Sequence, residues 1–141
     1  MKDTVYDTEV IARANRHIHK GVISGNLSHR LDLITECVTG KRIALYNNTL
    51  RYEYTTIIKE HRNDIIDLFI RGLTDYGKPC RNTLSRQDYH RAKPIRWPAH
   101  DRHLLAAATD GIDTTIFVVE PRLHNCAEKV LRIFGFRVIK V

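Results

Sequence analysis

The chain has 141 residues and carries 23 Lys and Arg against 16 Asp and Glu, a net charge of +7. Its length suits a single domain over residues 1–141, which can bury enough surface to fold without disulfides or metal. The 7 Gly and 4 Pro exclude a collagen-like or Pro/Gly-rich disordered chain. No apolar run approaches the roughly 20 residues of a membrane-spanning helix, and no apolar stretch typical of a secretory signal follows the first residues.

The three cysteines are scattered and have no metal-binding or disulfide-framework spacing, so a reducing compartment is favoured. We therefore expect a cytoplasmic protein with no membrane partner. The excess of positive charge favours a polyanionic partner such as nucleic acid, with plain solubility as the alternative.

The first third of the chain alternates between strand and helix patterns. Residues 5–11 indicate a strand that runs into a helix. Apolar residues recur on one helical face over residues 27–38, with Asn26 or Ser28 as the expected cap. A short apolar run over residues 43–46, bounded by Gly and Asn residues, predicts a buried strand.

Two helices are expected next. Asn48 or Thr49 is expected to cap the first, and Gly77 to follow the second. Their apolar stripes consist of Leu50, Tyr54, Ile57 and Ile58 in the first helix, and Ile65, Ile66, Phe69, Ile70 and Leu73 in the second.

A basic connection over residues 78–100, in which one short helix is expected, separates these helices from a regular ending. A short helix is expected over residues 101–109 and a buried strand over 114–119. A helix should then run from Pro121 to a C-terminal Gly135, followed by a last strand. Strand–helix–strand units with short joints form parallel sheets, so we predict an α/β fold, three-layer α/β/α, with a central, largely parallel sheet.

Four acidic residues fall where such folds place function, beyond the carboxyl ends of the strands. Asp7 and Glu120 follow strands, Asp101 opens a helix on its buried side, and Glu53 borders an apolar stripe. Clustered, partly buried carboxylates repel one another unless a cation offsets their charge, and Mg²⁺ or Mn²⁺ is the natural counterpart. Singly, each acid has a plainer interpretation as a helix cap or a solvated residue, and periodicity alone does not bring the four together.

The sequence around these acids resembles the motifs of the PIN-domain family. Val5-Tyr6-Asp7-Thr8 is similar to its opening strand, Leu50-Arg51-Tyr52-Glu53-Tyr54 to its second motif, residues 100–108 to its third, and Val118-Val119-Glu120-Pro121-Arg122-Leu123 to its fourth. The third, an Asp followed by an apolar, Ala-rich helix, is the most specific. Order and spacing also match, and the resemblance covers the whole chain.

The resemblance implies a metal-dependent endoribonuclease that hydrolyses RNA phosphodiester bonds. Asp7, Glu53 and Asp101 would form the catalytic, metal-binding core for Mg²⁺ or Mn²⁺, with Glu120 as a fourth acid. Because many small members are VapC-type toxins paired with an antitoxin, and many form homodimers, an antitoxin protein and a homodimer are expected partners.

Three positions depart from the family pattern. Glu9 stands where Asn is usual, Val118 where a Thr hydroxyl is usual, and Glu120 is one methylene longer than the usual Asp. The alternative prediction is therefore a PIN-like module that binds RNA or a protein partner without cutting. A purely structural subunit is a third interpretation.

The basic connection is the expected RNA-binding element, with a solvated loop as the alternative. Tyr89 and Trp97 within it could stack on a base. Its expected phosphate-binding residues are Lys78, Arg81, Arg86, Arg91, Lys93 and Arg96.

Histidine pairs offer a weaker alternative. Neither His17 with His19 nor His100 with His103 has the Cys pair or HExxH context typical of zinc sites. His100 and His103 flank Asp101, where they could contact the substrate or orient the carboxylate.

Overall fold

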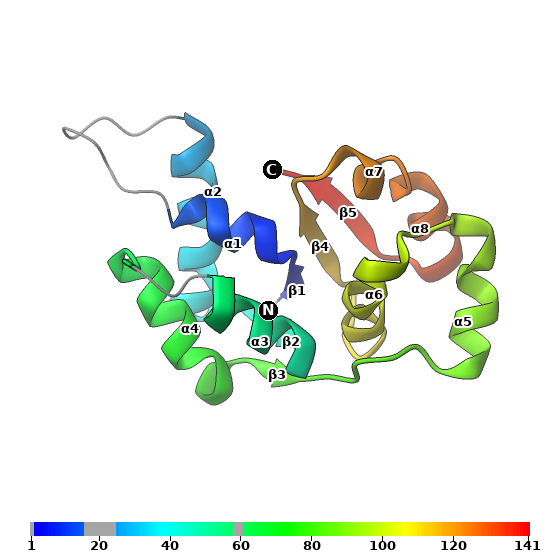
Figure 1. Cartoon of the computed structure of the whole chain (residues 1–141), viewed down its shortest axis with the longest axis horizontal. Helices are drawn as coiled ribbons and strands as arrows, with labels where there is room; N and C mark the ends of the chain where they lie inside the picture. The colour runs from blue at the N-terminus through cyan, green and yellow to red at the C-terminus, as the bar shows by residue number, and fades with distance from the viewer. Residues whose placement is uncertain (1, 16–24, 58–60) are drawn as a thin grey trace.

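A five-stranded, wholly parallel sheet in the order β3-β2-β1-β4-β5 forms the centre of the protein (Figure 1). This computed structural model describes residues 2–15, 25–57 and 61–141. The predicted α/β class with a parallel central sheet is confirmed. The strands are β1 (Lys2–Tyr6), β2 (Arg42–Tyr46), β3 (Lys78–Pro79), β4 (Thr115–Val118) and β5 (Arg137–Lys140).

Helices cover both faces of the sheet and produce three layers. α2 (Gly25–Val38) and α4 (Asp64–Tyr76) pack on one face, while α6 (Arg102–Thr109) and α8 (Ala127–Phe134) pack on the other (Figure 1). Tyr6 of β1 ties the first layer to the sheet. Its hydroxyl donates to the carbonyl oxygen of Leu33 at 2.7 Å, and its ring lies edge-on to Phe69 at 5.6 Å.

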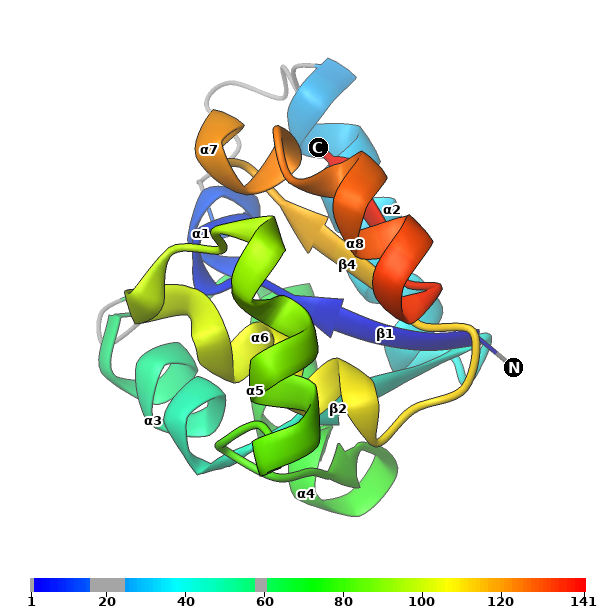
Figure 2. The same ribbon diagram turned by 90° about the vertical axis from the view of Figure 1, so that its right-hand side faces the viewer.

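Three further helices begin where strands end. α1 (Thr8–Ala14), α3 (Asn48–Ile57) and α7 (Pro121–His124) follow β1, β2 and β4 after one or two residues. Figure 2 shows the arrowheads of β1 and β4 pointing toward the side on which these three helices lie. Parallel strands therefore deliver the residues that follow them to one edge of the sheet.

The connection between β3 and α6 is mostly short helical turns. It contains α5 (Arg86–Ala92) and two 3-10 turns, η1 (Lys93–Ile95) and η2 (Ala99–Asp101). The single short helix expected there is α5. Within the described parts of the chain, no helix is both long and apolar enough to cross a membrane.

The predicted helix starts need two corrections. Asn47, and not Asn48 or Thr49, caps α3, because its Oδ1 accepts from the backbone N–H of Leu50 at 2.9 Å. α2 begins at Gly25, so Asn26 and Ser28 lie inside its first turn. Asn48 and Thr49 likewise lie inside α3.

The apolar faces also differ in detail from the prediction. Val38, the last residue of α2, is 36% exposed rather than facing the core. Ile58 lies outside the described residues.

The helix expected from Pro121 onward is two helices. α7 ends at His124 and α8 starts at Ala127. Pro121 occupies the predicted first helical position. Gly135 ends α8 with a φ of 80°, the left-handed conformation that glycine adopts without strain.

Candidate active site

The structure brings the four predicted acids to a single cavity of about 450 Å³ at the carboxyl ends of β1 and β4. Asp7 directly follows β1, and Glu120 opens α7 shortly after β4. Glu53 comes from α3, and Asp101 ends η2 just before α6. The remaining lining residues are Thr8, Glu9, Arg13, Val119 and Pro121.

Asp7 is the most buried of the four, at 9% exposed. Burial raises the pKa of its carboxyl from 3.8 to about 7, and the negative charge of Asp101 adds to this. The backbone N–H of Thr8 acts in the opposite direction, while the charges of Glu53 and Glu9 raise the pKa further. Protonated and ionised forms of this carboxyl therefore both occur near neutral pH, where an ordinary Asp is ionised.

Asp101 is half-buried and responds to the same cluster. Burial raises its pKa, and the charges of Glu120 and Glu53 act in the same direction. His103 and His100 oppose this effect. The negative charges of these acids therefore act on one another across the cavity, although the residues come from distant parts of the chain.

The backbone at Asp101 is held by a buried tryptophan. Trp97 is 6% exposed, and its indole N–H donates to the carbonyl oxygen of Asp101 at 2.7 Å. The N–H of Asp101 donates to the carbonyl oxygen of Pro98 at 3.0 Å. The indole packs inside the protein and positions Asp101, so it offers no open face for the predicted base stacking.

Glu53 is oriented by two neighbours. The hydroxyl of Thr8 donates to its Oε2 at 2.7 Å, while Nε2 of His103 lies 3.2 Å from its Oε1. The His103 contact meets the distance of an ion pair but not the geometry of a hydrogen bond, and Nε2 makes no other hydrogen bond within the described residues. The contact is an ion pair only when the imidazole is protonated. The sequence placed His103 beside Asp101, whereas its ring faces Glu53.

Arginines pair with the acids at the edge of the cavity. Nε of Arg122 lies 2.5 Å from Oε1 of Glu120, and Nε of Arg13 lies 3.0 Å from Oε1 of Glu9. Both pairs are partly open to solvent and contribute little to stability. Both cations are thus already paired with acids, and Arg13 also lines the cavity.

The donor chemistry of the cavity fits Mg²⁺ or Mn²⁺, which favour carboxylate oxygens. The spacing is less favourable: across residues 2–15, 25–57 and 61–141, no three Asp, Glu, His or Cys side chains lie close enough, as placed, to hold an ion together. The shared cavity and the mutual pKa effects nevertheless put the four acids within electrostatic range. Carboxylates that repel one another favour separated rotamers, so ion binding would require these side chains to rotate toward one another.

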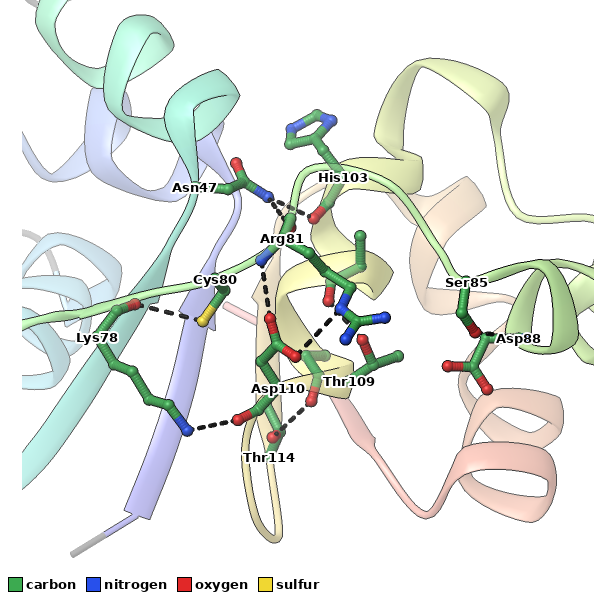
Figure 3. A network of polar contacts seen from close by, with 12 residues as sticks. Asn47, Lys78, Cys80, Arg81, Ser85, Asp88, His103, Thr109, Asp110 and Thr114 are labelled. Atoms are coloured by element: carbon green, nitrogen blue, oxygen red, sulfur yellow. Dashed lines mark hydrogen bonds and ion pairs between the residues drawn. The ribbon is translucent and has the colours of Figure 1, made fainter.

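Two of the predicted RNA-binding residues hold the basic connection against the end of α6 (Figure 3). Nζ of Lys78 donates to the carbonyl oxygen of Asp110 at 2.6 Å. The backbone N–H and Nε of Arg81 donate to the Asp110 carboxylate at 2.8 and 3.2 Å. Asn47 joins the same network, because its Nδ2 donates to the carbonyl oxygens of Arg81 and His103 at 3.1 and 3.0 Å.

Arg91 has a similar structural role on the other side of the connection. It pairs with Asp88 at 3.1 Å and donates to the carbonyl oxygen of Ile133 at 2.5 Å. Its guanidinium lies 4.8 Å from the ring centroid of Phe134, a cation–π contact that ties α5 to α8.

The other three predicted RNA-binding residues, Arg86, Lys93 and Arg96, are exposed. Lys93 and Arg102 both contact the ring of Tyr89, at 5.7 and 5.3 Å from its centroid. All six predicted residues lie outside the lining of the acidic cavity. His17 and His19, weighed for zinc, lie outside the described residues.

Comparisons with protein-family models, with curated proteins and with solved structures found no match to this chain. The resemblance to PIN-domain motifs therefore stays a prediction from the sequence.

Proposed function

We propose that this protein is a metal-dependent ribonuclease that hydrolyses RNA phosphodiester bonds at the acidic cavity. One observation carries the proposal: four carboxylates spread from residue 7 to residue 120 line the same cavity. Two of them have raised pKa values caused by burial and by one another. Such an arrangement opposes folding, and perturbed carboxylates in a cavity are typical of functional sites.

Asp7, Glu53, Asp101 and Glu120 are the residues that would hold Mg²⁺ or Mn²⁺. A bound ion of this kind neutralises charge on phosphate oxygens and activates water for hydrolysis. The protein's own part is to position the carboxylates. Thr8 fixes one oxygen of Glu53, and Trp97 fixes the backbone that carries Asp101.

A second candidate is a PIN-like module that binds RNA or a protein partner without cutting it. The wide spacing of the carboxylates favours this alternative. It predicts salt-dependent RNA binding with no turnover at any Mg²⁺ or Mn²⁺ concentration. A toxin role with an antitoxin partner, and a homodimer, extend the leading proposal.

The test is cleavage of single-stranded RNA by purified protein across Mg²⁺ and Mn²⁺ concentrations and with EDTA. We expect cleavage that needs a divalent ion and that Asp7→Asn or Asp101→Asn abolishes, with RNA binding retained or strengthened. Asp32→Asn, an exposed change on α2, is the matched control and should cut normally. Full cleavage in EDTA, or by Asp101→Asn, would contradict the proposal.

A further inference from the structure

A second cavity, of about 520 Å³, adjoins the acidic one. The two share Arg13, Val119 and Pro121 in their linings. The second cavity extends from the end of α1 to the first turn of α2 and the last residues of β5. Its other lining residues are Asn26, His29, Arg30, Lys140 and Val141.

The sign of the side-chain charge reverses between the two cavities. Five carboxylates and one cation, Arg13, line the first. Arg13, Arg30, Lys140 and the titratable His29 line the second, and no Asp or Glu side chain is among its described lining residues. Arg13 stands at the boundary, paired with Glu9 of the acidic side at 3.0 Å.

The basic side chains of the second cavity differ in their hydrogen bonding and in their exposure to solvent. Nη2 of Arg30 donates to the backbone oxygen of Val141 at 3.3 Å, and Arg30 is partly buried. Lys140 and His29 are exposed, and they come from β5 and α2. These two side chains therefore give the cavity an accessible wall of one lysine and one histidine, built from elements far apart in the sequence.

A single-stranded nucleic acid carries a negative charge on every nucleotide. Carboxylates repel those charges wherever no cation intervenes, whereas Lys and Arg bind them and release counterions. A strand with one phosphate at the acidic cavity therefore gains most if a neighbouring phosphate lies among cations. The basic connection over residues 78–100 lies outside the linings of both cavities.

We propose that the basic cavity lined by Arg13, His29, Arg30 and Lys140 binds a backbone phosphate of the RNA strand, next to the phosphate that is cut at the acidic cavity. This inference rests on the proposed ribonuclease function for the identity of the strand. It assigns strand binding at the site to the ends of α1, α2 and β5 rather than to the connection before α6.

The experiment measures RNA affinity without cleavage. Fluorescence anisotropy of a short, labelled single-stranded RNA is recorded in EDTA over a range of salt concentrations. The variants are His29→Glu with Lys140→Glu, and the matched control Lys41→Glu, an exposed charge reversal directly before β2. For each phosphate that a variant no longer binds, the slope of log affinity against log salt should decrease in magnitude by about 0.7.

We expect weaker binding and a reduced slope for the double variant, with wild-type values for Lys41→Glu. Equal effects of the two variants, no effect of the double variant, or no RNA binding by the wild type would overturn the inference. If thermal unfolding shows that the double variant is not folded, Lys140→Gln alone should still reduce the slope, and an unchanged slope would overturn the inference.

Cleavage is scored separately in Mg²⁺ and Mn²⁺, so the two proposals can fail independently. Wild-type protein that binds through Lys140 but never cuts would refute the ribonuclease and leave the phosphate site standing. Wild-type protein that cuts, while the double variant binds RNA normally, would refute only the phosphate site.

Discussion

Replacing Asp7 with Asn should stabilise the protein at neutral and alkaline pH. Asp7 is buried among other carboxylates, and its pKa is raised from 3.8 to about 7. Asn has nearly the same shape but carries no charge. The substitution therefore removes the cost of burying a charge while leaving the packing in place.

The direction in which pH changes the free energy of unfolding follows from proton binding. Between pH 3.8 and about 7, folded Asp7 holds a proton that the unfolded chain has already released. The contribution of Asp7 to stability is thus fully present below pH 3.8 and is lost as the pH rises through about 7. At about 1.4 kcal/mol for each pKa unit, the loss amounts to about 4 kcal/mol at most.

The assay is urea unfolding of wild type and Asp7→Asn from pH 4 to pH 8, without divalent ions. The free energies of unfolding should nearly coincide at pH 4, and the variant should be more stable by up to about 4 kcal/mol at pH 8. Asp32→Asn, the exposed control, should show no such pH-dependent gain. If Asp7→Asn is less stable than wild type at pH 8, or if the difference does not change with pH, the reasoning about the cavity is wrong.

Three further predictions concern the ion, a cap and a glycine. Mg²⁺ or Mn²⁺ at a hundred times its dissociation constant for wild type should stabilise wild type by about 2.7 kcal/mol in urea unfolding at pH 8. An equal gain for Asp101→Asn at the same ion concentration would exclude a metal role for that carboxylate. Asn47→Ala removes two buried hydrogen bonds and one partly buried one and should cost about 2–4 kcal/mol in the same assay; a cost below about 0.5 kcal/mol would show that water replaces them. Gly111→Ala would place a Cβ 2.5 Å from Cδ1 of Leu45 and should lower the free energy of unfolding by about 1–3 kcal/mol. Gly25→Ala, with nothing within 4 Å of its Cβ, is the control and should be nearly neutral.

The parts of the fold that depend on long apolar patterns were predictable. Apolar runs and turn residues located the strand predicted over residues 114–119, observed as Thr115–Val118, and the helix that precedes Gly135, because burial constrains many residues at once. β3 was missed because its two residues, Lys78 and Pro79, carry no strand pattern and are defined only by pairing with β2. The break between α7 and α8 was missed because Leu123 and Val130 keep a helical spacing across it, and both are buried.

The acidic residues of the site were predictable, but their supports were not. Asp7, Asp101 and Glu120 stand at strand ends or helix starts, which parallel topology brings together, and Glu53 lies inside the helix that follows β2. The residues that hold these acids in place could not be predicted, because their side-chain orientations depend on tertiary packing. The contact of His103 with Glu53 and the three bonds of Asn47 are of this kind.

The basic cavity was missed for a related reason. Its cations come singly from α1, α2 and β5, so no run of positive residues marks it in the sequence. The run that does stand out, over residues 78–96, uses Lys78, Arg81 and Arg91 to hold its own segment in place. Several positive residues of this run therefore stabilise the fold, and a run of charge in the sequence does not by itself mark a binding surface.

The central position of β1 has a consequence for synthesis on the ribosome. β1 is synthesised before both of its neighbours in the sheet, and one of them, β4, starts only at Thr115. Until β4 has been synthesised, the strand that precedes Asp7 lacks one of its two pairing partners. The acidic cavity therefore takes shape only after synthesis has passed Glu120, which lines it.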